Sequence, residues 1–213
     1  MTASSVSGRR AVRRRNRRGQ GERLREDLIS GALEIVELHG LEALSLRSVA
    51  RHVGIAATSV YLHFPDLDHL VAAVVERGFH ALGATTDELA SPVSDPAEQL
   101  RARCRAYCRF ALDHPNLYQA MFQADLPRAT ITGDPSATPG RRAFDRLVAA
   151  VERCLDSGLA ADHEDPFRLA SLIWTAEHGI ASTRISRPSF PWAPLDALVN
   201  EMVNRLMGFR NGS

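Results

Sequence analysis

The sequence predicts an all-α protein, and two observations support that prediction. From residue 22 onward, apolar residues recur at spacings of three and four, which places them on one face of a helix. No stretch alternates apolar and polar residues over the length of a strand. The chain has 213 residues, of which 45% are hydrophobic and 24% charged. It is long enough for one large domain, or for two small ones that share a continuous core.

Glycine, serine and proline mark the ends of four helices in the N-terminal part. Gly40 and Gly54 suit the left-handed residue that ends many helices, and Ser45 is a natural N-cap for the short helix between them. Pro65 and Asp66 open a longer helix. The expected helices cover residues 22–39, 46–53 and about 56–62, followed by the long fourth helix.

Proline also divides the C-terminal part into helices. Asp165 and Pro166 form an N-cap and first-turn pair. Three prolines and two glycines within residues 125–140 indicate a flexible loop. The expected helices cover residues 96–113, 115–123, 141–156, 165–186 and 194–207.

The composition argues against several classes of protein. No apolar run approaches the ~20 residues that span a bilayer, so we expect no membrane partner. Three cysteines give no disulfide framework and fit a reducing cytoplasm. The spacing of Cys104 and Cys108 matches no zinc pattern, so we expect no metal and no cofactor. The chain also lacks a glycine-rich phosphate loop and a nucleophile elbow, so we do not expect an enzyme.

Charge is unevenly distributed along the chain. All 26 basic residues are arginine, and seven of them lie within the first 20 residues, which contain no acid. The remaining chain carries 19 arginines and 25 acidic residues. We therefore expect residues 1–21 to form a disordered basic arm whose partner is a polyanion such as nucleic acid. The alternative is a tail that only improves solubility.

Residues 46–62 have the spacing of a helix-turn-helix. A small residue in the first helix lets the two helices approach, the turn needs a residue that tolerates positive φ, and the second helix needs an apolar plug. Ala50, Gly54 and Val60 provide these three residues. An ordinary helical hairpin could also contain Ala and Gly, but the complete pattern favours a DNA-binding domain over residues 22–68. Its second helix would enter the major groove of double-stranded DNA.

The same region resembles the head of the TetR/AcrR family of transcriptional regulators. The resemblance covers roughly residues 22–75 and rests on residues 45–50 (SLRSVA), 53–55 (VGI) and 60–64 (VYLHF). It implies an N-terminal three-helix head that is continuous with a helical-bundle regulatory domain, here residues 69–213. That domain would bind a small molecule and form a homodimer.

The resemblance also implies DNA-contacting residues. Arg47 would reach a base edge, with guanine the best match for a bidentate guanidinium. Ala57 and Thr58 would face bases at the start of the recognition helix, near a thymine methyl group. Tyr61 and Phe64 could instead pack between helices; we expect this for Phe64, and for Tyr61 a packed ring with its hydroxyl on phosphate. The residues expected to hold phosphates are Ser45, Ser59, Tyr61 and His63.

The head departs from its family in charge. Many relatives have a phosphate-contacting lysine where this chain has Leu67, and residues 21–70 hold four arginines and eight acids. Phosphate attraction must then come largely from the basic arm and from helix N-termini. We expect that deletion of residues 1–20 weakens DNA binding and flattens its salt dependence.

The body resembles one branch of the family, named for a Trp and a His-Gly pair. The matching residues are 114–118 (HPNLY), 121–122 (MF), Trp174 and His178-Gly179. The alternative for each pocket candidate is plain core packing, and His178 could equally be a core histidine with its hydrogen bonds satisfied. The residues expected to surround the ligand are Tyr107, Phe110, Met121, Phe122, Phe144, Trp174 and His178, with Leu117, Leu147 and Val151.

The last two helices carry apolar residues at bundle spacing. By resemblance they pair with their two-fold mates in a four-helix dimer interface, although some must serve the intramolecular core. A dimer would place its recognition helices about 34–36 Å apart and read a palindromic operator. The residues are Leu169, Leu172, Ile173, Ala176, Gly179 and Ile180, then Leu195, Val199, Met202 and Leu206.

These features predict a sequence-specific DNA-binding transcriptional regulator. We expect a repressor that is released from a palindromic operator by a small apolar or amphipathic effector, in the bacterial cytoplasm and at the nucleoid when bound to DNA. The alternative is a DNA-binding architectural protein without effector control. The helical body over residues 69–213 is larger than dimerisation alone requires, which favours the regulator.

Overall fold

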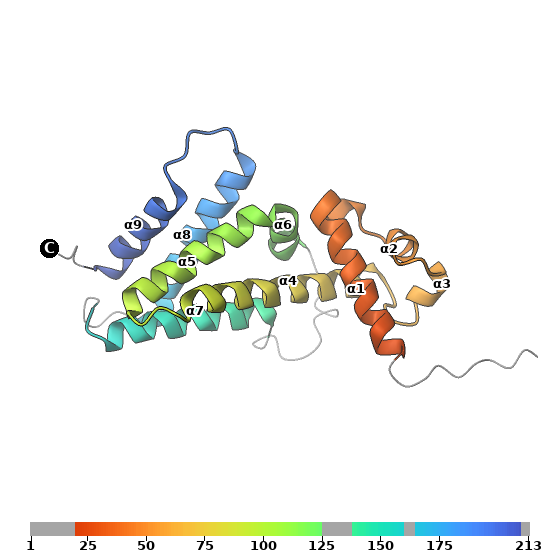
Figure 1. The fold of residues 1–213 in the computed structure, drawn as a ribbon, viewed down its shortest axis with the longest axis horizontal. Coiled ribbons are helices and arrows are strands. Elements are labelled where there is room, and N and C mark those ends of the chain that lie inside the picture. The colour runs from red at the N-terminus through yellow and green to blue at the C-terminus, as the bar shows by residue number, and fades with distance from the viewer. Residues whose placement is uncertain (1–19, 125–137, 160–164, 210–213) are drawn as a thin grey trace, which may run out of the picture.

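The computed structural model describes residues 20–124, 138–159 and 165–209, and every regular element within these ranges is helical. Figure 1 shows a small head at one end, formed by the first helices, and a larger body at the other. The elements are α1 (Gln20–His39), the short 3-10 helix η1 (Leu41–Ala43), α2 (Leu46–Val53), α3 (Ala57–Val60), α4 (Leu67–Ala90), α5 (Pro96–Asp113), α6 (Pro115–Gln123), α7 (Pro139–Asp156), α8 (Pro166–Ser186) and α9 (Leu195–Met207).

The head packs α1, α2, α3 and the first turns of α4 around one apolar core. Leu28, Val49, Val60 and Phe64 are fully buried there, and Val74 extends the core along α4. Burying a side chain of this size contributes roughly 1.5–3 kcal/mol, so a few such residues can hold these short helices together. Phe64 therefore packs in the core, as the sequence predicts.

Helix α4 belongs to both parts of the molecule. Its first turns contribute Leu70 and Val74 to the head, while Leu82 is buried farther along, against α5. Figure 1 shows α4 running from the head into the body beside α5 and α7. A 24-residue helix is about 36 Å long at 1.5 Å per residue, so one rigid element connects the two parts.

The body is a bundle with α5 at its centre. Helix α5 packs against α4, α7, α8 and α9, and much of its surface is buried, including Leu100, Cys104 and Cys108. Helix α6 is short and lies between α1 and α4, at the junction of head and body. The cavity described below lies among the helices around α5.

Three expected boundaries are wrong in detail. Helix α1 begins at Gln20, so the last two residues assigned to the basic arm are helical; residues 1–19 lie outside the described residues. Helix α3 ends at Val60, and turn residues follow it where the expected helix reached residue 62. Helix α7 begins at Pro139, whose side chain suits a first turn, and residues 125–137 of the expected loop are outside the described ranges.

The buried face of α9 coincides only in part with the stripe expected to form the dimer seam. Val199, Val203 and Met207 are buried at a spacing of four, whereas Leu195 and Met202 are only half-buried. Packing against α5 and α8 covers the stripe that contains Val203, whereas the expected seam forms a second stripe that shares only Val199 with it. The other stripe stays partly uncovered.

Candidate DNA-binding surface and ligand cavity

The turn between α2 and α3 has the geometry that its residues predict. Gly54 is left-handed, with φ 77° and ψ 32°, which costs an ordinary L-residue about 1 kcal/mol or more. The Ile55 amide then bonds back to the Ala50 carbonyl at 2.9 Å. Ala50 and Val60 are buried, so the small residue and the apolar plug lie between the two helices as expected.

A reciprocal cap fixes the start of α2. The Ser45 hydroxyl accepts from the Ser48 amide at 3.0 Å, and the Ser48 hydroxyl accepts from the Ser45 amide at 2.8 Å. Ser45 was expected to hold a phosphate; here its side chain is half-buried in the cap. Such a cap is worth about 1 kcal/mol, and it fixes the start of the helix whose second residue is the exposed Arg47.

The residues expected to read bases occupy the outer side of the head. Arg47 and Thr58 are exposed, and Ala57 is half-buried against the core. These three lie on α2 and α3, the two helices that the turn brings together. The arrangement can present a guanidinium and a hydroxyl to one surface of a duplex.

The remaining phosphate candidates surround α3. Ser59 and His63 are half-buried, and Tyr61 is 57% exposed. The expectation that the Tyr61 ring packs between helices is therefore wrong, because the chain leaves α3 after one turn and directs Tyr61 outward. Its hydroxyl is free to approach a phosphate.

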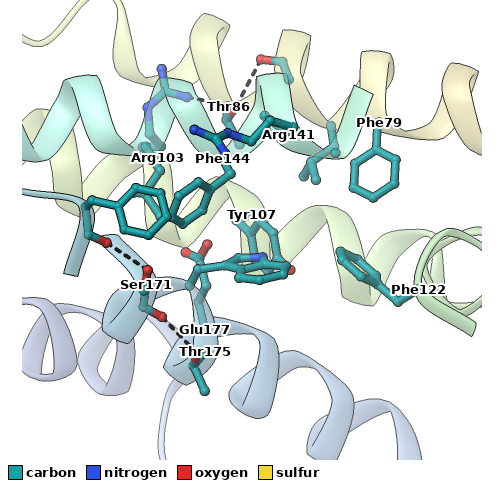
Figure 2. A pocket seen from close by; sticks show the side chains of 17 residues that line it. Phe79, Thr86, Arg103, Tyr107, Phe122, Arg141, Phe144, Ser171, Thr175 and Glu177 are labelled. Atoms are coloured by element: carbon teal, nitrogen blue, oxygen red, sulfur yellow. Dashed lines mark hydrogen bonds between the residues drawn. The ribbon is translucent and has the colours of Figure 1, made fainter. Parts of the chain in front are cut away.

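A cavity of about 490 Å³ lies in the body among α4, α5, α6, α7 and α8. This volume falls within the ~300–1,000 Å³ typical of small-molecule sites. Aromatic side chains form most of its apolar wall (Figure 2). They are Phe79, Tyr107, Phe122, Phe144, Phe167 and Trp174.

Four of the seven residues predicted to bind a ligand line this cavity: Tyr107, Phe122, Phe144 and Trp174. Phe122 and Phe79 meet edge to face with ring centroids 5.4 Å apart, and Phe144 meets Trp174 in the same way at 5.8 Å. Leu147, a further candidate, also lines the wall. The sequence thus identifies most of the aromatic lining but misses Phe79 and Phe167.

Phe110, Met121 and His178 are not among the lining residues. Phe110 packs on the His114 ring, 4.9 Å away, at the end of α5. Met121 lies over Gly78 of α4, where a Cβ atom would come within 2.8 Å of its sulfur. Leu117 and Val151 are likewise buried in the core. Each of these side chains points between helices instead of into the cavity.

His178 belongs to a hydrogen-bonded cluster behind the cavity wall. Its Nδ1 is 2.6 Å from the Tyr118 hydroxyl, which is 2.9 Å from the Tyr107 hydroxyl. Its Nε2 is 3.3 Å from the Ser182 hydroxyl. Burial lowers the pKa of the imidazole, which favours the neutral ring. His178 is half-buried in this cluster with its hydrogen bonds satisfied, and its role toward a ligand stays a prediction.

Sequence reasoning missed all the non-aromatic polar lining residues, which are Glu177, Arg103, Thr86, Arg141, Ser171 and Thr175. Glu177 is only 3% exposed, and burial raises the pKa of its carboxyl well above the ordinary value. Arg103 donates to the Thr86 hydroxyl at 3.2 Å and to the Asp87 carboxylate. One signal for Glu177 was available, because it follows Ile173 by four residues on the buried face of α8.

Head and body also meet through α6. The His114 ring is 2.8 Å from the Glu37 carboxylate, and the Asn116 side-chain amide donates to the Glu37 carbonyl at 2.8 Å. Since Glu37 lies in the last turn of α1, these contacts tie the end of that helix to α6. Phe122 of the same α6 lines the cavity. One short helix therefore contacts both the end of α1 in the head and the cavity in the body.

Within the described ranges, no three His, Cys, Asp or Glu side chains gather closely enough to hold a metal ion. Cys104 and Cys108 are free and fully buried on α5, where burial raises the pKa of both thiols. Among the described helices, none is both long and apolar enough to cross a membrane.

Comparison with known proteins supports the assignment of both regions. The family described as "Bacterial regulatory proteins, tetR family" matches residues 28–74, and the "Tetracyclin repressor-like, C-terminal domain" matches residues 100–206. The narrower Trp/His-Gly branch stays a prediction.

The matched relatives are transcriptional regulators and not enzymes. An HTH-type transcriptional repressor of Mycobacterium tuberculosis is 28% identical over 177 residues, or 83% of this chain, which spans only 63% of that relative's length. The repressor KstR of Mycolicibacterium smegmatis is 28% identical over 70% of each chain.

Solved structures share the fold. A protein of unknown function from Rhodococcus sp. RHA1 has a TM-score of 0.74 and 26% identity, over 87% of this chain and 95% of its own. FadR from Bacillus subtilis, in complex with stearoyl-CoA, has a TM-score of 0.68 and 16% identity over 85% and 97%. One family description matches the head, and the other matches half of the chain over residues 100–206. The chain therefore belongs to the TetR family of bacterial regulatory proteins.

Proposed function

We propose that this protein is a sequence-specific transcriptional repressor, released from a palindromic operator by a small apolar or amphipathic effector. The observation that carries the proposal is the continuity of α4. Leu70 and Val74 of this helix lie in the head core, and Phe79, Leu82 and Thr86 line the cavity. A molecule that fills the cavity therefore contacts the same rigid element that supports the DNA-binding helices.

DNA recognition would depend on α2 and α3. Arg47 and Thr58 are exposed at the positions expected to read base edges, and Tyr61 is available for a phosphate. The basic arm would add attraction that does not depend on sequence, because the head itself holds more acids than arginines.

The dimer would form through α8 and α9. On α8, Leu172 is 44% exposed and Gly179 has open space around it, while Leu169 and Ile173 are buried within the protomer. On α9, Met202 is half-buried. Small and apolar residues left uncovered on neighbouring helices allow a second copy to pack closely. We assign the interface to these uncovered residues and the inner stripe to the protomer core.

Effector control would be a shift between two conformations. In one conformation of the dimer the two heads have the spacing of the operator half-sites, and in the other they do not. A ligand that binds the second conformation more tightly lowers operator affinity by the difference between its two binding free energies. Solved structures of this fold contain ligands of different chemistry: RolR is in complex with resorcinol, and FadR is in complex with stearoyl-CoA. The cavity disfavours an architectural protein without effector control, since such a protein gains nothing from 490 Å³ of unfilled apolar space.

The test is selection of genomic DNA fragments by the purified full-length protein, followed by anisotropy titrations at several salt concentrations. We expect a short palindrome, with affinity for it reduced roughly 5- to 150-fold in Arg47→Ala, since a bidentate contact is worth about 1–3 kcal/mol. Arg51→Ala, one turn farther along α2, is the matched control. Binding that is strongly salt-dependent yet blind to sequence would overturn the proposal.

A further inference from the structure

The chemistry of the cavity narrows the class of effector. Its wall is aromatic and aliphatic apart from a few polar side chains, of which Arg103 and Glu177 are the most deeply buried charged types. Buried groups of this kind are stable only when hydrogen-bonded or paired. The hydrogen-bond partners of Arg103 and Glu177 therefore indicate which class of ligand the cavity can bind.

Arg103 has one donor left over. Its terminal nitrogens donate to Thr86 and Asp87, and its side chain is 11% exposed. The Nε–H group is buried and finds no acceptor among the described residues. A buried donor without an acceptor costs roughly 1–3 kcal/mol. The guanidinium is thus short of one acceptor.

Glu177 offers a second donor in the same cavity. Figure 2 shows its carboxyl beside Tyr107. The thiol of Cys104 interacts with this carboxyl. Desolvation raises the pKa of this carboxyl well above its ordinary value, which favours the protonated form and its O–H group.

The charges around the cavity add a third argument. Two guanidinium groups line it, those of Arg103 and Arg141, and Arg141 pairs with the Asp145 carboxylate, at 2.7 Å, which is not part of the lining. Burial favours the uncharged form of the Glu177 carboxyl. Asp87 pairs with Arg103 and also lies 3.5 Å from Arg146, so one carboxylate serves two guanidinium groups. This local excess of positive charge favours an anion.

We propose that the effector is an apolar organic acid, with its carboxylate held between Arg103 and Glu177 and its hydrocarbon body against the aromatic wall. This inference rests on the proposed function, because it names the ligand class of the proposed regulatory site. A carboxylate offers acceptor oxygens to both side chains, and charge-assisted hydrogen bonds are about twice as strong as neutral ones. Phe79, Phe122 and Phe144 supply the apolar surface for the rest of the molecule.

Other ligand classes fit less well. An ammonium ion would approach Arg103 and Arg141 and would leave the Arg103 donor without an acceptor. A hydrocarbon without a polar group would leave the same donor unmet. An uncharged amide could accept from both side chains, but it would gain nothing from the excess positive charge.

The test compares three probes that differ only in the head group: 4-phenylbutyrate, 4-phenylbutanamide and 4-phenylbutylamine. Calorimetric titration of the full-length protein at pH 7 should show the acid binding about 10-fold or more tightly than the amide, and the amine most weakly. A series of ω-phenylalkanoates with three to eight methylene groups adjusts the body to the cavity.

Two variants locate the effect. Arg103→Met should abolish the preference for the acid over the amide. Arg109→Met is the matched control, because Arg109 lies on the same helix but is exposed and paired with Asp196. This control should keep the preference. Circular dichroism checks that both variants fold, and the comparison of probes on the unaltered protein does not depend on either variant.

Three outcomes would overturn the proposal: tightest binding of the amine, equal affinity for acid and amide, or no binding by any member of the acid series. The operator titration on the same preparation keeps the two proposals separate. Operator binding without acid selectivity would refute the effector class alone. Acid selectivity without operator binding would refute the regulator and leave the organic-acid cavity standing.

Discussion

Glu177 shows how one side chain sets a pH dependence. Burial keeps its carboxyl protonated in the folded protein well above the ordinary pKa of a glutamate, about 4.3. Between that value and the raised one, the folded state binds a proton that the unfolded state releases. The contribution of Glu177 to stability therefore falls as pH rises through this window.

We predict that Glu177→Gln gains stability over the unaltered protein as pH increases from 5 to 8. The gain should approach about 1.4 kcal/mol for each pH unit over which only the folded state holds the proton. Urea denaturation across this range measures it. Thr86→Val is a control from the same cavity: neither side chain titrates, so its stability difference should stay constant. A difference for Glu177→Gln that does not change with pH would contradict the prediction.

At the scale of residues, the sequence predicts correctly those positions where the backbone conformation requires a particular type of residue. Gly54 and Ser45 were identified because a left-handed turn and a helix cap each need particular residue types. Glu177 and Arg103 were missed, because their importance comes from which helices surround them. An acid inside an apolar stripe has the sequence signature of an exposed residue until its burial is known.

At the scale of elements, α6 is the second connection between head and cavity. Asn116 donates to the Glu37 carbonyl in the last turn of α1, where the helix has carbonyls without partners of its own. Phe122, near the other end of α6, lines the cavity. A ligand that displaces α6 would therefore also change the contacts at the end of α1.

We predict that Asn116→Ala lowers stability by about 1 kcal/mol and speeds amide hydrogen exchange in the last turn of α1. Asn204→Ala is the matched control, because Asn204 accepts from Arg101 at the same 2.8 Å but joins α9 to α5. The control should lose similar stability without changing exchange in α1. Unchanged exchange at α1 in Asn116→Ala would show that α6 does not hold this helix end.

The elements differ in how well the sequence predicts them. Long helices such as α4 and α8 have repeated apolar positions and clear caps, so their existence follows from pattern alone. Helix α3 is a single turn, too short to show a period, and its end depends on packing against α2. The inner face of α9 could not be chosen in advance, because two apolar stripes overlap and only the partner helices decide between them.

At the scale of the whole molecule, DNA affinity and dimerisation should be inseparable. A single head contacts half of a palindrome, and a linked pair of binding modules gains roughly 10²–10⁴ in affinity from the second contact. In the proposed dimer, the arm and the head residues would act within each half-site, whereas the uncovered face of α8 would decide whether two half-sites are read together. A change at this face can therefore abolish operator binding without touching the DNA-binding surface.

Gly179→Arg tests this connection. Gly179 is exposed and nothing lies within 4 Å of the position where a Cβ would be, so the protomer tolerates a side chain there. The long charged side chain would instead block the close approach of a second α8. We predict a folded monomer in light scattering, with operator affinity lowered roughly 100-fold or more. Leu38→Arg, a change at a 70% exposed residue of α1, should remain a dimer. If Gly179→Arg also remains a dimer with full operator affinity, this face of α8 is not the interface and the palindrome must be read through another contact.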